Sequence, residues 1–399
     1  MARGPGKTVK DKGVDPADAV PTPRANPLLV GQEEAEATVL GAWAGGRMSH
    51  AWLITGPRGV GKATLAHRLA RFILAHGLSG MAAGTQPSGL FGDAAAPLAP
   101  PPSGLTMDPG DPLFQRIVAG GHGDLRVVER GFADERQAQR DLDAGRVPRR
   151  RGEIVVDDVR GVGAFLALTP AEGGWRVVVI DAADEMNRNA VNAVLKVLEE
   201  PPRRAVLILV AHNPARLPAT IPSRCRRLTL RPLSEPVMRD LLSRYRPDLD
   251  ADAHTTLIAL SRGSIGVALT LARRGGLELY DEMTSMLGDL PRLDVARLHA
   301  LGDKAAQDEV AWGLLRDMLP GWLGRLARFL AVQGAEGVAT NAREAEVMAR
   351  LGRAAPLDRW VAVWEKTAHL LGRTEAVHLD RKQAILAALL LVERTAARA

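Results

Sequence analysis

A glycine-rich segment from Leu53 to Thr64 constrains this chain more than any other feature of its sequence. It reads Leu-Ile-Thr-Gly-Pro-Arg-Gly-Val-Gly-Lys-Ala-Thr, an apolar strand followed by a turn that ends in Lys62. Glycines in such a turn let backbone N–H groups converge on phosphate oxygens, while the lysine and the N-terminus of the next helix add positive charge. The spacing therefore predicts a phosphate-binding loop between a strand and a helix. The alternative is a chance glycine turn.

The residue after Lys62 departs from what a hydrolysing site needs. A competent NTPase has Ser or Thr here, whose hydroxyl holds Mg²⁺, and this chain has Ala63. Thr64 comes one residue later, which on a helix is a rotation of about 100°. The candidates for a weak or vestigial ATP or ADP site are Gly56, Pro57, Arg58, Gly59, Val60, Gly61, Lys62, Ala63, Thr64 and Asp181.

Composition bounds the class of protein. The chain has 399 residues, 46% apolar and 25% charged, which is typical of a globular protein with two or three domains. It has no N-terminal apolar segment and no run of about eighteen uncharged apolar residues, so we expect a cytoplasmic protein without a membrane span. The single cysteine, Cys225, excludes an internal disulfide and any multi-cysteine zinc module. A net charge of +6 is compatible with nucleic-acid contact but is modest for this length.

Strands and helices alternate in the first part of the chain. The β-branched run from Arg176 to Ile180 is typical of a strand buried in the middle of a parallel sheet. The pattern predicts a doubly wound α/β core with the phosphate loop at its C-terminal edge. The expected strands are 51–55, 125–129, 176–181, 205–211 and 227–230, and the expected helices are one ending at Trp43 and those at 63–74, 157–167 and 189–199.

Three segments lack this order. Residues 1–26 have no apolar periodicity and are expected to form a disordered, slightly basic tail, while residues 78–112 are rich in Gly, Pro, Ala and Ser and predict a flexible insertion. A basic cluster follows, which predicts a solvated loop, with phosphate contact as the alternative. It consists of Arg146, Arg149, Arg150 and Arg151.

Only helical patterns follow Pro232. Three short helices are expected up to about Arg274, and longer ones at 309–330, 357–371 and 380–394, each with an apolar stripe. The stripes predict a bundle core with part of the apolar surface free for subunit packing. The expected anchors of that packing are Trp312, Trp322, Trp360 and Trp364.

Two further motifs resemble a known family. The run NAVLKVLEEPP at 192–202 and the run LPATIPSRC at 217–225 are similar to signatures of the bacterial clamp-loader branch of the AAA+ ATPases. The resemblance covers about 27–274 and extends beyond that only in architecture. It implies an AAA+ α/β domain at 27–232, a helical lid at 233–275 and a helical collar at 277–399 that forms a ring. The motif residues are Lys196, Glu199, Glu200, Ser223, Arg224 and Cys225.

Three departures separate the chain from the motor subunits of that family. Ala63 lacks the metal-holding hydroxyl, and Ala182 stands where the resemblance implies the carboxylate that polarises the attacking water. Gly266 stands where it implies a phosphate-sensing arginine. Asp184 and Glu185 lie too far into the next turn to replace the carboxylate readily. We therefore expect little ATP hydrolysis by the chain itself.

One catalytic part is retained. The resemblance implies that Arg224 points out of its own subunit at the γ-phosphate held by a neighbour, as an arginine finger in trans. The alternative is that Arg224 caps a strand. A subunit of this kind is a stationary member of the DNA polymerase III clamp loader, which implies tau/gamma motor and delta subunits, the sliding clamp and primed DNA as partners, near the nucleoid.

Two rival hypotheses remain. One is an active ATPase motor of the same ring, which the phosphate loop alone would predict. The other is a small-molecule kinase with a helical appendage, which explains neither the LEEPP run nor the SRC motif. Many members of the family carry a four-cysteine zinc module after the phosphate-loop helix, and the segment 78–112 occupies that region here. No zinc is therefore expected.

Overall fold

The computed structural model describes residues 20–77, 104–144, 148–172, 174–332, 338–377 and 379–397. The chain divides into two compact units, Met1–Pro232 and Leu233–Ala399. The predicted lid and collar helices thus fall within one unit. Most of the predicted tail (1–19) and of the predicted insertion (78–103), together with Arg146, lies outside the described residues.

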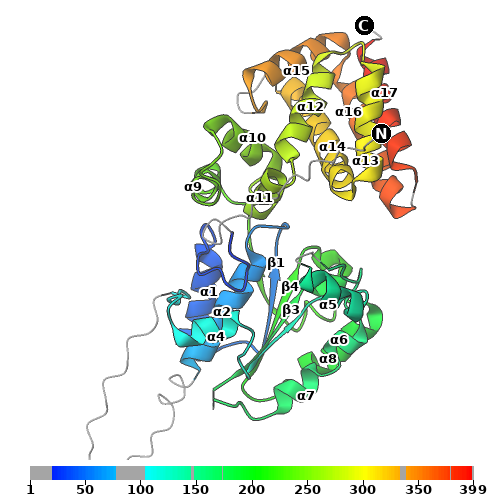
Figure 1. Cartoon of the computed structure of the whole chain (residues 1–399). Coiled ribbons are helices and arrows are strands. Elements are labelled where there is room, and N and C mark those ends of the chain that lie inside the picture. Colours follow the sequence, from blue (N-terminus) through cyan, green and yellow to red (C-terminus); the bar gives the residue numbers. More distant parts are fainter. Residues whose placement is uncertain are drawn as a thin grey trace, which may run out of the picture. The chain divides into compact units, whose positions relative to one another are not determined.

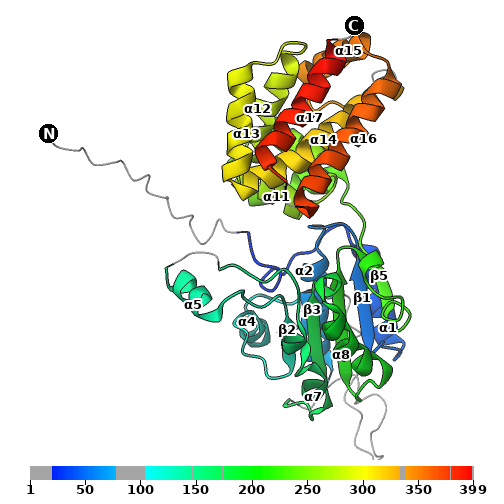
Figure 2. The same ribbon diagram turned by 90° about the vertical axis from the view of Figure 1, so that its right-hand side faces the viewer.

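The first unit is built on a parallel sheet of five strands (Figures 1 and 2). The strands are β1 (Ala51–Thr55), β2 (Leu125–Val128), β3 (Arg176–Asp181), β4 (Ala205–Ala211) and β5 (Arg226–Thr229), in the order β2-β3-β4-β1-β5. All neighbouring pairs are parallel, and β1 lies between β4 and β5 with every residue buried. The predicted α/β core with a parallel sheet is therefore confirmed.

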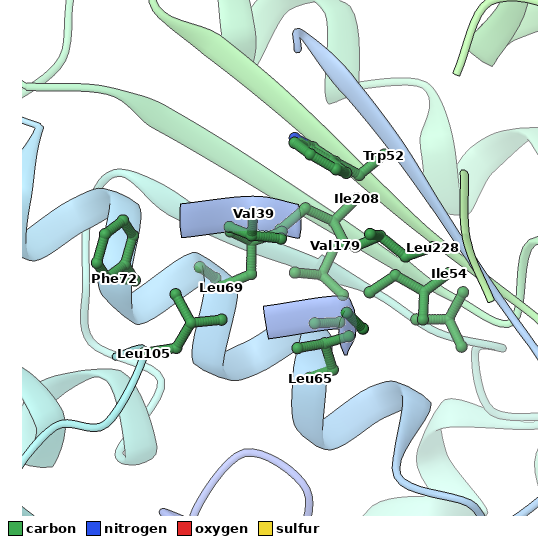
Figure 3. Packing of buried hydrophobic residues seen from close by; sticks show 14 of the residues in the cluster. Val39, Trp52, Ile54, Leu65, Leu69, Phe72, Leu105, Val179, Ile208 and Leu228 are labelled. Carbon is green, nitrogen blue, oxygen red and sulfur yellow. The ribbon is translucent and has the colours of Figure 1, made fainter. Parts of the chain in front are cut away.

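Each face of the sheet has its own apolar core, because alternate residues of a strand point to opposite faces. On one face Trp52 and Ile54 pack with α1 (Glu33–Ala44) and α2 (Lys62–His76), as Figure 3 shows. On the other face Leu53 and its neighbours pack with three helices, α6 (Val156–Val159), α7 (Val162–Ala167) and α8 (Arg188–Glu199). The single helix predicted for 157–167 is two short helices that break at Gly161, as expected from the low helix propensity of glycine.

Residues 20–27 lie against α2. The guanidinium of Arg71 is buried and donates to the carbonyl oxygens of Arg24 at 2.6 Å and Asn26 at 2.9 Å. Arg68 donates to the carbonyl oxygen of Pro27 and pairs with Glu36 at 2.8 Å. Buried guanidinium groups need such acceptors. Residues 24–26 are therefore held against α2, and the prediction of a disordered tail is wrong for these residues.

Two further short α-helices belong to the described part of the first unit. They are α4 (Pro112–Val118), which starts where the predicted insertion ends, and α5 (Glu135–Asp143). The ring of Phe114 in α4 lies 4.7 Å from the Arg71 guanidinium, a cation–π contact that ties α4 to α2.

The described residues of the second unit form helices joined by loops, with no strand. Its short helices are α9 (Glu235–Tyr245), α10 (Ala251–Ser261) and α11 (Ile265–Arg273). The others are α12 (Gly276–Gly288), α13 (Val295–Gln307), α14 (Glu309–Ala331), α15 (Ala342–Ala354), α16 (Leu357–Ala376) and α17 (Arg381–Ala396), and α14 packs against four of them, α12, α13, α15 and α16. None of the described helices combines the length and the apolar character that crossing a bilayer requires.

The tryptophans of the second unit do not share one role. Trp312, Trp322 and Trp360 are at most 1% exposed, whereas Trp364 is 39% exposed. The prediction that all four anchor subunit contacts is therefore wrong for the first three. Their apolar surface is covered inside the bundle, because α14, which carries Trp312 and Trp322, has helices on several sides, and α16, which carries Trp360, packs against α14 and α17.

Candidate nucleotide site and exposed arginine

The phosphate loop follows the carboxyl end of β1 and leads into α2. Gly56, Gly59 and Gly61 have φ values of 139°, 79° and 103°. Positive φ values of this kind are sterically unfavourable for every residue other than glycine. A Cβ at Gly56 would also collide with the carbonyl oxygen of Leu230, and one at Gly61 would lie 2.6 Å from the Cδ1 atom of Leu29. The backbone path of the loop therefore requires these glycines.

Lys62 is only 3% exposed and turns its side chain back onto the loop. Its Nζ atom donates to the carbonyl oxygens of Gly56 at 2.8 Å and Pro57 at 2.6 Å. Burial lowers the pKa of Lys62 to about 8, although the nearby Asp181 and Asp184 carboxylates act in the opposite direction. Two of its three N–H donors are engaged within the loop, which leaves one for a phosphate oxygen.

The start of α2 supplies no hydroxyl at the position where a metal would be held. Ala63 is half-buried and presents a methyl group. Thr64 is buried at 8% exposure and lies one residue further round the helix. The residues present therefore do not fit the magnesium ion that a hydrolysing loop requires.

The end of β3 carries no carboxylate at the position where the resemblance implies the catalytic base. Ala182 follows Asp181 and is buried. Burial raises the pKa of Asp181 to about 6, and the nearby Glu129 carboxylate adds to this effect, while Lys62 opposes it. This aspartate is thus the ionisable group closest in sequence to the place of the catalytic base.

The two acidic residues after Ala182 serve the fold. They lie in the short 3-10 helix η2 (Ala183–Glu185). The Asp184 carboxylate accepts hydrogen bonds from the backbone N–H groups of His212 at 2.9 Å and Asn213 at 2.8 Å, just after β4. Glu185 pairs with Arg130 at 2.9 Å. Sequence reasoning placed both residues too far away to act as a base, but it did not predict these partners.

Arg224 lies just before β5, and its side chain is 36% exposed. Its Nη1 atom donates to the carbonyl oxygen of Thr220 at 3.1 Å, and its Nη2 atom lies 3.0 Å from the Glu199 Oε1 atom. Glu199 is the last residue of α8. The LEEPP and SRC motifs, recognised separately in the sequence, therefore meet in one ion pair.

The remaining motif residues surround this pair. Ser223 donates from its hydroxyl to the Thr220 carbonyl oxygen at 3.0 Å. Cys225 packs against the core of the α8 face, and burial raises the pKa of its thiol to about 11. Lys196 and Glu200 are exposed. Gly266 belongs to the second unit, in the first turn of α11.

Two of the three described arginines of the cluster, Arg150 and Arg151, form ion pairs within the chain, while Arg149 is exposed. Arg150 pairs with Glu129 at 2.8 Å, and Arg151 pairs with Asp158 at 2.7 Å. These two guanidinium groups therefore have structural partners in the first unit, which favours the loop interpretation over phosphate contact.

Comparison with known proteins adds an independent line of support. The family model described as DNA polymerase III, delta subunit, matches residues 113–234. The DNA polymerase III subunit delta-prime of Pseudomonas aeruginosa is 30% identical over 296 residues, which cover 74% of this chain and 77% of that protein. The DNA polymerase III subunit tau of Escherichia coli is 26% identical over 75% of this chain, and this chain spans only 43% of the tau subunit.

A solved structure of a gamma subunit-related protein from Thermotoga maritima overlaps 87% of this chain and 95% of that one, with 18% identity and a TM-score of 0.38. That score is too low to carry an argument, and the fold follows instead from the sheet order. The delta-prime match, in contrast, covers more than two thirds of both chains. This chain therefore belongs to the DNA polymerase III delta-prime family.

Proposed function

We propose that this chain is a non-hydrolysing, delta-prime-like subunit of a DNA polymerase III clamp loader, and that Arg224 acts on ATP held by a neighbouring subunit. The observation that supports this proposal is a contrast within one domain. Ala63 and Ala182 remove the metal-holding hydroxyl and the catalytic carboxylate, while Arg224 is retained and partly exposed. Such a chain can contribute an arginine to ATP hydrolysis on a neighbouring subunit, but it lacks the groups that its own phosphate loop would need to hydrolyse ATP.

The guanidinium group of Arg224 would stabilise the charge that develops during ATP hydrolysis. During phosphoryl transfer, charge spreads over the γ-phosphate oxygens, and an arginine supplied from a second subunit stabilises it, with an effect of about 10³ to 10⁵ in rate. Arg224 carries five N–H donors in a planar fork that matches phosphate oxygens. The proposed partners are the tau/gamma motor subunits, which hold the ATP, and the delta subunit, the sliding clamp and primed DNA, in the cytoplasm near the nucleoid.

Exposed apolar side chains of the second unit support a role in assembly. Four of its large apolar side chains are exposed on α16 or just after it, namely Leu357, Trp364, Val377 and Leu379. Exposed apolar side chains concentrated on one helix are typical of protein interfaces. We propose that α16 forms part of the collar contact, in a chain organised as an α/β domain at 27–232, a lid at 233–275 and a collar at 277–399.

The test is an Arg224→Ala variant in a reconstituted clamp-loader complex. Because Arg224 acts on the rate of phosphoryl transfer, we expect normal assembly and reduced DNA-stimulated ATP hydrolysis. The loss is partial, because other interfaces bring their own arginines. Arg224→Lys does not restore the rate, since an ammonium group lacks the planar fork.

Arg160→Ala is the matched control. Arg160 is also an exposed arginine of the first unit, held in an ion pair with Asp157 at 3.0 Å. This variant is expected to leave hydrolysis unchanged. An Arg224→Ala complex that assembles, hydrolyses ATP and loads clamps at the wild-type rate would reduce the chain to a passive scaffold.

A further inference from the structure

The ion pair between Glu199 and Arg224 has a consequence for how the arginine acts. We infer that Glu199 is a positioning residue, which holds the Arg224 guanidinium in the orientation that engages a γ-phosphate on the neighbouring subunit. The inference rests on the function proposed above. It adds a second residue, from a different helix, to the machinery that this chain contributes.

Two anchors hold the guanidinium along one edge. Glu199 Oε1 lies 3.0 Å from Nη2, and the Thr220 carbonyl oxygen accepts a hydrogen bond from Nη1 at 3.1 Å. Nη1 therefore has one N–H group engaged in a hydrogen bond, while Nη2 is held by the charge of the carboxylate. The remaining N–H groups of the guanidinium are left to meet phosphate oxygens, so the anchors do not consume the donors that the reaction needs.

Both acceptor groups belong to backbone segments that are fixed by the buried core. Glu199 ends α8, whose buried residues Val191, Val194 and Leu198 pack in the core of the sheet. Thr220 lies next to Ile221, which is fully buried and whose carbonyl oxygen accepts a hydrogen bond from the Arg224 N–H group. The acceptors therefore keep fixed positions, and the long arginine side chain takes its orientation from them.

The pair has little value for folding, which points to another use. The Glu199 side chain is 50% exposed and the Arg224 side chain 36% exposed. Exposed ion pairs of this kind contribute little to stability. An arginine that is held in place before it meets a phosphate loses less side-chain entropy when it docks, and correct orientation of a reacting or stabilising group raises the rate.

Variants at Glu199 test the inference in the reconstituted complex. The measured quantity is the Arg224-dependent rate, which is the wild-type DNA-stimulated ATP hydrolysis minus that of Arg224→Ala. We expect Glu199→Ala to remove at least half of it. Glu199→Gln is expected to retain only part of it, because the amide keeps the size of the side chain but lacks the charge that holds Nη2.

The effect should fall on kcat with the KM for ATP unchanged, since the contact matters when charge develops during the transfer. In the Arg224→Ala background, Glu199→Ala is expected to cause no further loss, because a residue that acts only through Arg224 has nothing left to position. Asp157→Ala breaks an exposed ion pair of the same length in the same unit and serves as the control. Thermal melting of each isolated variant checks that the fold is retained.

The outcomes separate this inference from the proposed function. If Arg224→Ala leaves the rate unchanged, the arginine has no role in trans, and both ideas are wrong. If Arg224→Ala lowers the rate while Glu199→Ala does not, only the positioning role is overturned. A rate above wild type for Glu199→Ala would mean that the carboxylate restrains the arginine, and additive losses would mean that it acts by another route. Either result also contradicts the inference.

Discussion

The Lys62 ammonium donates a hydrogen bond to the carbonyl oxygen of Pro57 at 2.6 Å, within its own phosphate loop. A second bond to Gly56 at 2.8 Å completes this arrangement. In a working loop the lysine instead reaches the β- and γ-phosphates. The loop of this chain therefore keeps the backbone conformation of a nucleotide site. Its Lys62 ammonium group, however, is hydrogen-bonded to the backbone that would surround the phosphates.

The first prediction concerns ATP turnover. We expect the isolated chain to hydrolyse ATP negligibly, measured as steady-state phosphate release. Ala63→Thr alone should not change this, because the carboxylate is still missing at Ala182. Turnover of about one per second, typical of a working enzyme and abolished by Lys62→Ala, would contradict the prediction and favour the active motor.

A second prediction follows from the pKa of Asp181, which burial raises from 3.8 to about 6. Between these values the native state binds more protons than the unfolded state, so its stability falls as the pH rises through this window. The loss should be about 2 kcal/mol and should be absent in Asp181→Asn, whose side chain is always neutral. Hydrogen exchange of the β3 amides at both ends of the window reports on the first unit alone. Parallel pH profiles for the two proteins would refute the prediction.

Two tryptophans of α16 provide a matched pair for the third prediction. Trp360 is fully buried and donates from Nε1 to the Leu351 carbonyl oxygen at 3.1 Å, whereas Trp364 is 39% exposed. Trp360→Ala should destabilise the second unit by about 3 to 5 kcal/mol, because it creates a cavity and removes a buried hydrogen bond. Trp364→Ala should cost about 1 kcal/mol in the isolated chain and weaken assembly. Thermal unfolding measures the loss of stability, and co-purification with motor subunits measures the loss of assembly. Equal destabilisation by the two substitutions would contradict the prediction.

A fourth prediction concerns the segment that Arg71 holds. Arg71→Ala removes the donors that bind the carbonyl oxygens of Arg24 and Asn26. Since hydrogen bonds to charged groups contribute about 1.5 to 3 kcal/mol, trypsin should cleave after Arg24 at least about tenfold faster, as cleavage follows the open population. Arg47→Ala, at an exposed position, is the control. Unchanged cleavage would show that other contacts hold the segment.

The fifth prediction concerns where the chain can be cut. A chain ending at 275 keeps α9, α10 and α11 but loses α12, against which α10 and α11 pack. It should bind more of a dye specific for exposed apolar surface than a chain ending at Pro232, where the first unit ends. Both truncated chains should fail to co-purify with motor subunits if the second unit forms the collar. Assembly of either one with undiminished affinity would exclude that role.

Much of the fold followed from local patterns. The β-branched run at 176–180, the glycine spacing at 56–61 and the helical stripes after Pro232 each depend on a short period, which neighbouring residues determine through backbone geometry. The sequence alone therefore identified the parallel sheet, the phosphate loop and the helical second half. The spacing of the phosphate loop predicts that Ala63 replaces the metal-holding hydroxyl, and the family resemblance implies that Ala182 replaces the catalytic carboxylate.

The tertiary structure decided which distant residues meet. Nothing in the spacing of the LEEPP and SRC motifs places Glu199 against Arg224, and nothing in the acidic turn after β3 pairs Asp184 with the backbone after β4. The same holds for Trp360, whose apolar stripe is equally compatible with a core and with an interface. Such contacts depend on how whole elements pack, and the packing is set by the summed burial of many side chains rather than by any local sequence period.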